Sequence, residues 1–259
     1  MLEESLFIIF IIFFTIFIGT MIVVGFFLIY KSIQNKIYNL LIVGFGYISL
    51  IFGIIGNLIF DLGNLFQEIF VFTSFVLTVI FTNMTFYKSK NKIANYVLIV
   101  VIILGIIQIS YYIIKVPTAV LIYIWIALDI PYTAIVFNWL AWSSYLAYKA
   151  IRKHNIQPWI KIRYKMIAIF SFILSFHNIP EFFQPLDVGW GDPTNIASLG
   201  VFGATAILAA IFSIGFAFAW IMPKKVKNYY NRHYKSLKDL EINEKDLLEQ
   251  LREELSKNN

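Results

Sequence analysis

The sequence predicts an all-α, polytopic membrane protein. We expect a bundle of seven transmembrane helices (residues 1–223) with the N-terminus outside, followed by a cytoplasmic tail (224–259) with a short amphipathic helix. Of the 259 residues, 59% are hydrophobic and only 14% are charged, whereas charged residues make up about 25% of an ordinary soluble domain. Seven apolar runs of about 20 to 30 residues follow one another, each long enough to cross a bilayer. Basic residues gather in alternate connecting segments, as membrane topology requires.

The seven runs predict one helix each. The first has Phe and Ile on every side and should face lipid, and the acidic residues before it indicate that it is not a cleaved signal peptide. The second has a face of small residues that permits close helix approach. The third and fourth contain the amide residues Asn83 and Gln108, which we expect to form interhelical hydrogen bonds. The fifth and sixth contain prolines, and the seventh is rich in Gly and Ala and suits the bundle centre. In chain order, the predicted helices cover residues 6–30, 38–60, 65–87, 94–114, 119–148, 164–186 and 196–222.

The loops predict the orientation, because Lys and Arg near span ends are retained in the cytoplasm. One side has only Lys115 and a set of acids: Glu3, Glu4, Asp61, Glu68, Asp187 and Asp192. The other side has fourteen basic residues: Lys31, Lys36, Lys88, Lys90, Lys92, Lys149, Arg152, Lys153, Lys161, Arg163, Lys165, Lys224, Lys225 and Lys227. The net charge of +6 therefore reflects membrane orientation, and we expect no nucleic-acid partner. The predicted localisation is the cell membrane.

Polar residues at membrane depth are the candidate site, since a charged group there is costly unless it is paired or faces water. The fifth helix carries Asp129 beside Pro131. The sixth carries His177 and Glu181, which are four residues apart and so share a helical face, beside Pro180. We expect an outward-facing cavity among the second, fifth and sixth helices, with seven ligand-binding residues: Asn57, Asp61, Asp129, His177, Asn178, Glu181 and Gln184. The alternative is a buried His177–Glu181 pair that only fixes helix packing.

Specific enzyme chemistries find little support in the sequence. There is no cysteine, which excludes thiolate metal sites and Cys nucleophiles. His177 is the only histidine at membrane depth, so ligands for a metal are too few, and no lysine in the seventh helix could form a retinal Schiff base. No phosphate-binding loop or dinucleotide motif occurs. We therefore expect no catalytic residues, no metal and no cofactor.

The tail combines a basic segment with a leucine stripe. After Pro223, residues 224–238 are basic with interleaved tyrosines, as in an interfacial anchor. Asn243 is a predicted N-cap, and the helix that follows carries leucines on one face. Such a short helix is marginal alone. Its stripe needs the bundle, a second copy or a cytoplasmic protein as partner, and comprises Leu247, Leu248, Leu251 and Leu255.

The arrangement resembles the seven-helix sensor modules that precede signalling domains such as histidine kinases. The bias toward Ile, Lys and Asn, and stretches such as Thr85-Phe-Tyr-Lys and Pro158-Trp-Ile-Lys-Ile-Arg-Tyr-Lys, are similar to uncharacterised archaeal seven-helix membrane proteins. The resemblance to sensors implies that a separate partner carries the output. We therefore expect a sensor or receptor-like protein. The alternative is a transporter or channel that uses Asp129 and Glu181, with broken fifth and sixth helices, and an intramembrane enzyme is a more distant one.

Overall fold

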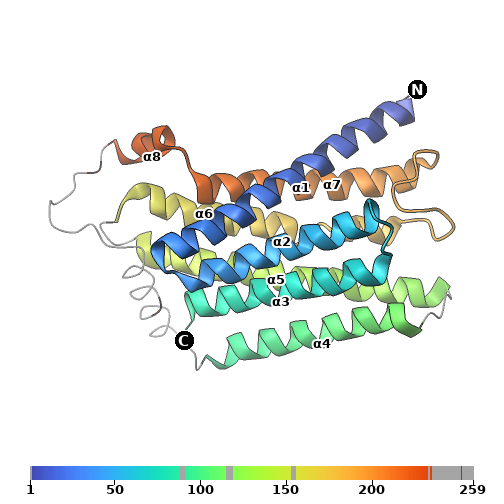
Figure 1. Ribbon diagram of the computed structural model, residues 1–259, viewed down its shortest axis with the longest axis horizontal. Coiled ribbons are helices and arrows are strands. Elements are labelled where there is room, and N and C mark those ends of the chain that lie inside the picture. The colour runs from blue at the N-terminus through green and yellow to red at the C-terminus, as the bar shows by residue number, and fades with distance from the viewer. Residues whose placement is uncertain are drawn as a thin grey trace.

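The computed structural model describes residues 2–87, 91–114, 119–152, 156–232, 234 and 252, without the side chains of residues 2 and 119–122. Within these ranges all regular secondary structure is helical (Figure 1). Seven helices are long and apolar enough to cross a membrane, as in a multi-pass membrane protein. The elements are α1 (Leu2–Asn35), α2 (Tyr38–Leu58), α3 (Asn64–Phe86), α4 (Lys92–Ile114), α5 (Ala119–Arg152), α6 (Pro158–Leu174), the 3-10 helix η1 (Ile179–Phe183), α7 (Ile196–Ile221) and α8 (Lys224–Asn231).

The seven predicted spans are confirmed in number and approximate place, but the sixth was wrong in its bounds and continuity. α6 starts at Pro158, six residues before the predicted start, because proline is well suited to the first turn of a helix. It ends at Leu174, and η1 follows after a turn. In this segment the N–H of His177 donates to the carbonyl of Leu174 at 3.0 Å, and that of Glu181 to the carbonyl of Asn178 at 3.1 Å. His177 and Glu181 therefore do not share an α-helical face.

Pro180 and Pro131 differ in their effect on helix continuity. Pro180 lies in η1, where the three-residue hydrogen-bond spacing accommodates the missing N–H. Pro131 lies inside α5, which continues from Ala119 to Arg152. The expectation of a broken fifth helix was therefore wrong, whereas the sixth span is indeed interrupted.

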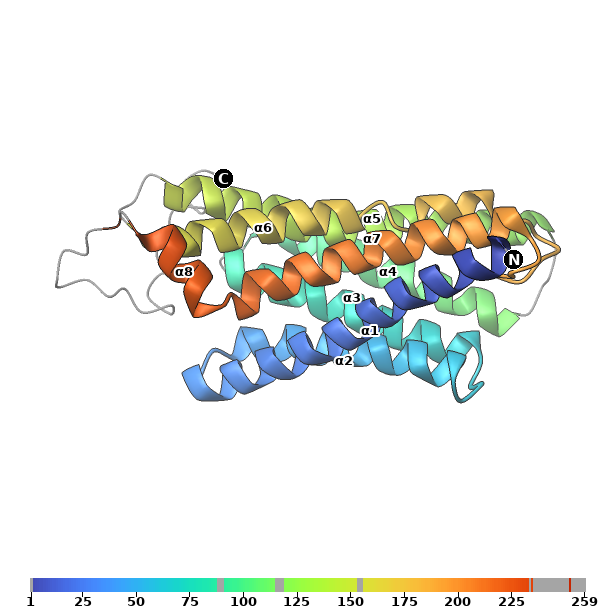
Figure 2. The same ribbon diagram turned by 90° about the horizontal axis from the view of Figure 1, so that it is seen from above.

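The helices close into a ring. α1 contacts both α2 and α7, and the remaining ring contacts are α2 with α3, α3 with α5, α5 with α6, and α6 with α7. α4 lies outside this ring against α3 and α5. Figures 1 and 2 show α1 crossing α7 obliquely, which closes the ring between its first and last members. α1 exposes a broad apolar face that includes Ile8, Ile12 and Val23, and α7 is the most buried of the seven spans, as the sequence predicted.

The small-residue face of α2 packs against α3, as expected. Ser49 donates a hydrogen bond from its hydroxyl to the carbonyl of Phe70 at 3.1 Å. A Cβ atom added at Gly53 would lie 2.7 Å from the Cβ of Phe70, and one at Gly46 would lie 3.3 Å from the Cβ of Leu77. These contacts hold the two helices close together along the wall of the ring.

The bundle has two chemically different ends. The acidic end contains the start of α1 with Glu3 and Glu4, the 59–63 loop and the 184–195 loop, at the right of Figure 1. The basic end contains the α1–α2 turn with Lys36 and the helix α8, at the left. The predicted amphipathic tail helix, with Leu247, Leu248, Leu251 and Leu255, lies outside the described residues. The one described residue in that region, Arg252, donates hydrogen bonds to the carbonyls of Met84 and Thr85 at the basic end of α3.

Candidate functional site

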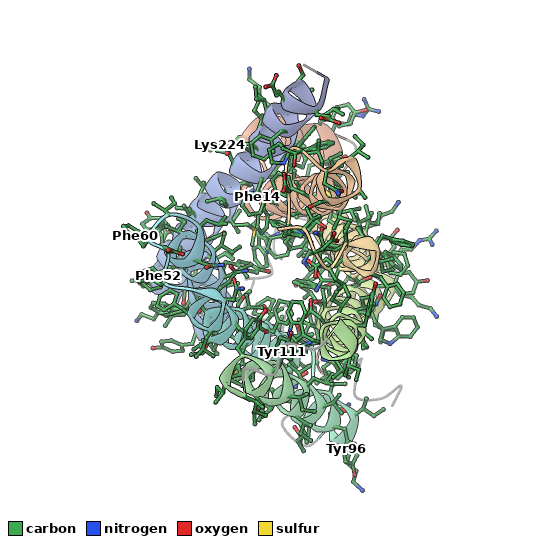
Figure 3. All side chains as sticks on the ribbon, turned by 90° about the vertical axis from the view of Figure 1, so that its right-hand side faces the viewer. Phe14, Phe52, Phe60, Tyr96, Tyr111 and Lys224 are labelled. Carbon is green, nitrogen blue, oxygen red and sulfur yellow. The ribbon has the colours of Figure 1, made fainter. Side chains whose placement is uncertain are left out.

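A cavity of about 430 Å³ occupies the half of the ring nearer the acidic end. Each of the seven spanning helices contributes at least one lining side chain. Figure 3 looks onto the acidic end and shows open space among the side chains at the centre of the bundle, with Phe14 of α1 near its upper border. Small-molecule sites in proteins usually occupy roughly 300–1,000 Å³, so this cavity is large enough for a small organic ligand.

Six of the seven predicted binding residues line this cavity, and one does not. Asp61 is exposed in the loop after α2 and has a positive φ of 51°. It lies off the face of α2 because that helix ends at Leu58, so its predicted place in the cavity was wrong. The residues that do line the cavity are Asn57, Asp129, His177, Asn178, Glu181 and Gln184.

Asn178 connects the turn after α6 to α5. Its side-chain amide donates to the carboxylate of Asp129 and, at 2.8 Å, to the hydroxyl oxygen of Thr133. Both Asn178 and Thr133 are buried, so these hydrogen bonds form in a low-dielectric environment where their loss is costly. Thr133 was not predicted, because a threonine on an apolar helix has no distinctive sequence signal.

His177 contacts a nearby backbone carbonyl and a hydroxyl group of α7. Its Nδ1 lies 3.2 Å from the carbonyl of Leu174, and its backbone carbonyl accepts a hydrogen bond from the hydroxyl of Thr205 at 3.3 Å. Among the hydrogen bonds of the described residues, none joins His177 to Glu181. The expected alternative, a self-satisfying His177–Glu181 pair, is therefore not formed, and the Glu181 carboxyl lines the cavity.

Glu68 is the cavity residue that the sequence reasoning missed. It lies one turn into α3 and is only 7% exposed, yet it was grouped with the acids of the external loops. Its Oε1 atom is buried and finds no hydrogen-bond partner in the described part of the chain. Glu68 could have been recognised, because it lies inside the predicted third span. A charged group at membrane depth is costly unless it is paired or faces water, as for Asp129 and Glu181.

The cavity therefore contains three carboxyl groups from three separate elements. Glu68 comes from α3, Asp129 from α5 and Glu181 from η1. No Lys or Arg is among the described residues that line the cavity. Neutral polar groups are supplied by amide side chains near the rim, and much of the remaining wall is aromatic: Phe14, Phe17, Phe75, Tyr112, Trp125, Phe137 and Trp190.

The 184–195 loop forms part of the rim at the acidic end. The amide of Gln184 donates to the carbonyl of Val188 at 3.0 Å and to the hydroxyl of Ser198 at 3.2 Å, which ties the loop to the start of α7. Trp190 lines the cavity and packs edge-on against Phe202, with ring centroids 4.8 Å apart. Hydrogen bonds from the hydroxyl and N–H of Thr194 hold the pKa of Asp192 below its usual range, so this carboxylate adds negative charge to the same end.

Packed aromatic rings lie on the side of the cavity nearer the basic end. Phe137 lines the cavity and packs against Phe212 at 5.7 Å between ring centroids. Phe212 packs on Phe216 at 5.1 Å, and Phe216 packs on Tyr47 at 5.3 Å. These four side chains are almost completely buried. We call them the aromatic floor.

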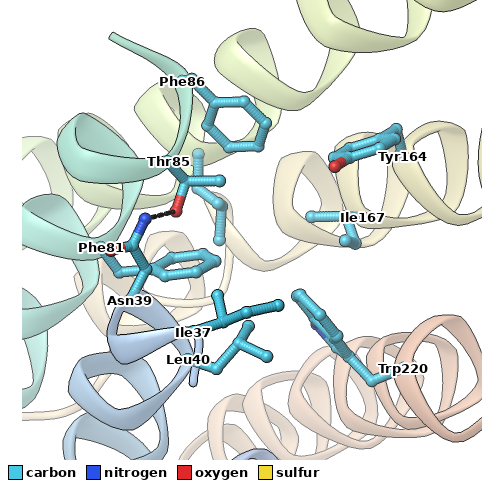
Figure 4. A pocket seen from close by; sticks show the side chains of 10 residues that line it. Ile37, Asn39, Leu40, Phe81, Thr85, Phe86, Tyr164, Ile167 and Trp220 are labelled. Carbon is cyan, nitrogen blue, oxygen red and sulfur yellow. Dashed lines mark hydrogen bonds between the residues drawn. The ribbon is translucent and has the colours of Figure 1, made fainter. Parts of the chain in front are cut away.

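A second cavity lies beyond the aromatic floor, near the basic end (Figure 4). Its volume is about 20 Å³, enough for about one water molecule. Its walls are mainly apolar, and the Asn39 amide donates to the Thr85 hydroxyl at 3.4 Å beside it. The two cavities share no lining residue, so buried aromatic side chains separate the large cavity from the small one.

The arrangement is suited to binding an organic molecule rather than one metal ion. In the described ranges no group of three or more His, Asp or Glu residues is positioned to hold a metal. The fold and the cavity thus define a bundle with seven helices long and apolar enough to cross a membrane, around an acidic and aromatic cavity. Comparison with protein families, curated proteins and solved structures finds no match to this chain.

Proposed function

We propose that this protein is a sensor or receptor-like membrane protein that binds a small molecule from outside the cell. The supporting observation is the aromatic floor, which lies on the side of the cavity nearer the basic end. The fourteen basic residues of the opposite side favour a cytoplasmic basic end, which makes the cavity outward-facing. A ligand that enters from outside then reaches a closed site and is retained rather than passed through.

The signal would leave through the cytoplasmic tail. Arg252 contacts the carbonyls at the basic end of α3, and α3 also carries Glu68 in the cavity. A ligand that shifts α3 would therefore alter the surface on which this part of the tail rests. The leucine stripe, Leu247, Leu248, Leu251 and Leu255, is the proposed contact for a cytoplasmic protein or a second copy.

The second candidate function is transport of a small molecule or ion. It is favoured by the interruption of the sixth span at Ser175 and by the carboxyl groups of Asp129 and Glu181, since transporters form their sites at such breaks. Transport requires that the site become accessible from both sides of the membrane, whereas a sensor needs access from one side only. The two functions can therefore be separated by measuring access.

Single-cysteine labelling measures access directly, because the natural chain has no cysteine. Ala209 of α7 lines the cavity, whereas Ser213 is one turn further toward the basic end and is completely buried. We expect Ala209→Cys to react with membrane-impermeant trimethylammonioethyl methanethiosulfonate added outside oriented vesicles, but not with reagent added inside. The matched control Ser213→Cys should react from neither side. Labelling of Ala209→Cys from the inside would contradict the sensor proposal and favour transport.

A further inference from the structure

The charge of the cavity is unbalanced. Glu68, Asp129 and Glu181 reach it from α3, α5 and η1, and no described Lys or Arg lines it. Among the described lining residues His177 is the only basic side chain, and its Nδ1 lies 3.2 Å from the carbonyl of Leu174. A carboxylate at membrane depth requires a paired charge, hydrogen bonds or water. Asp129 has the Asn178 amide as a partner, whereas Oε1 of Glu68 has no hydrogen-bond partner among the described residues.

Glu68 is an independent indication of a missing ligand. Its side chain is more than nine-tenths buried, it lines the cavity, and its Oε1 has no hydrogen-bond partner among the described residues. Buried polar atoms in folded proteins are normally hydrogen-bonded to protein, water or ligand. A donor that enters the cavity with a positive charge would satisfy this oxygen and offset the charge of the cluster.

The size and walls of the cavity indicate what carries that charge. A single metal ion would fill little of 430 Å³, and the described acids are not grouped to ligate one. The walls instead provide aromatic rings, including Tyr112, Trp125 and Phe137, beside the carboxyl groups. The faces of aromatic rings attract ammonium groups, and they also pack against the apolar part of a ligand.

We propose that the cavity selects small organic cations: an ammonium group binds among Glu68, Asp129 and Glu181, and the aromatic walls cover the apolar part of the molecule. This inference rests on the proposed outward-facing cavity and adds the chemical class of its ligand. A neutral or anionic molecule of the same size would leave the carboxyl groups unpaired and would bind more weakly.

The test compares a cationic with an anionic thiol reagent in the full chain with Ala209→Cys. The reagents are trimethylammonioethyl and sulfonatoethyl methanethiosulfonate, added outside. The reference is Gly189→Cys on the exposed rim loop, where an added Cβ has no neighbour within 4 Å. We expect the ratio of cation to anion rates to be about tenfold higher at residue 209 than at residue 189.

Neutralising substitutions test whether the cavity carboxyl groups of Glu68, Asp129 and Glu181 cause the preference for the cationic reagent. Adding Glu68→Gln or Glu181→Gln should lower the ratio of cation to anion labelling rates at residue 209 several-fold. Each substitution removes one carboxyl group from the cavity and keeps the volume of the side chain. The matched control is Glu3→Gln, which removes one exposed carboxyl at the same end of the bundle and should leave the ratio unchanged. A second measurement leaves the three carboxyl groups unchanged and tests protection of residue 209 from labelling. Phenethylamine should slow the labelling, and uncharged phenethyl alcohol at the same concentration should not.

The outcomes separate this inference from the proposed function. If both reagents label residue 209 with the ratio seen at residue 189, or if phenethyl alcohol protects as well as phenethylamine, selectivity for cations is wrong while the outward-facing cavity stands. An unchanged ratio in both Glu68→Gln and Glu181→Gln would equally overturn the role of the cluster. If neither reagent reaches residue 209 from outside, the outward-facing cavity and the inference both fail.

Discussion

Asn178 links the interrupted part of the sixth span to α5 by hydrogen bonds. Its amide donates to Asp129 and to Thr133 and is itself buried. A residue with two buried interhelical acceptors contributes to stability mainly through what its loss leaves unpaired. Asn178 therefore has a positioning role for the Asp129 carboxyl, in addition to its place in the cavity wall.

Replacing Asn178 with Ala should lower the free energy of unfolding by about 1–3 kcal/mol, because the Asp129 and Thr133 oxygens lose their donor. Titration with sodium dodecyl sulfate in mixed micelles measures this change. Asn95→Ala on the exposed surface of α4 is the control and should have almost no effect. Equal stability of the two variants would mean that the Asn178 hydrogen bonds contribute nothing to the fold.

Asp129→Asn distinguishes the role of Asp129 in the charge of the cavity from its role in the stability of the fold. The asparagine carbonyl can still accept the hydrogen bond from Asn178, so stability should stay close to that of the natural chain. The cavity loses one negative charge, so the preference for the cationic reagent at Ala209→Cys should fall several-fold. A variant that is strongly destabilised but retains full charge preference would show that Asp129 is structural only.

At the scale of elements, the contact between α2 and α3 positions Glu68. Gly53 lets α2 approach the backbone and side chains of α3 near Gln67 and Phe70. Nearby, the Asn57 amide donates to the side-chain oxygen of Gln67 at 2.7 Å. Because Glu68 directly follows Gln67, the position of its carboxyl depends on how closely these two helices pack.

Gly53→Val should destabilise the bundle by about 1–3 kcal/mol, because the added side chain meets Phe70 and Gln67 and forces the helices apart. Gly19→Val is the matched control, since an added Cβ on Gly19 of α1 has no neighbour within 4 Å. Unfolding in mixed micelles compares the two. If Gly53→Val is no less stable than Gly19→Val, the close approach of α2 and α3 does not limit stability.

For the whole molecule, membrane orientation decides whether the cavity faces outward. The two ends differ in charge because Lys and Arg gather at one end of the ring and carboxylates at the other. We expect a green fluorescent protein fused after Asn259 to fluoresce, since it folds in the cytoplasm, and an epitope placed before Met1 to be cleaved by protease added to intact cells. A protected N-terminal epitope together with a dark C-terminal fusion would reverse the topology and place the cavity on the cytoplasmic side.

Hydropathy and helical spacing predict the seven spans and most of the polar residues at depth from the amino-acid sequence alone. Hydropathy and helical rise are local properties, so runs such as 196–222 and buried acids such as Asp129 and Glu181 are visible without a fold. Six of seven candidate residues consequently line one cavity. The errors lie at the ends of spans: Glu68, inside the predicted third span, is counted with the external acids, and Asp61, just after the predicted second span, is counted with the face of that helix.

Contacts between distant residues determine which helix faces meet and which side chains border the cavity. The contact between α1 and α7 closes the ring, and the packing of Phe137, Phe212 and Phe216 forms the floor. The interruption after Leu174 places His177 and Glu181 by turn geometry instead of helical spacing. The physical reason is that these features depend on contacts between residues far apart in the chain, whereas composition and periodicity report only on neighbours.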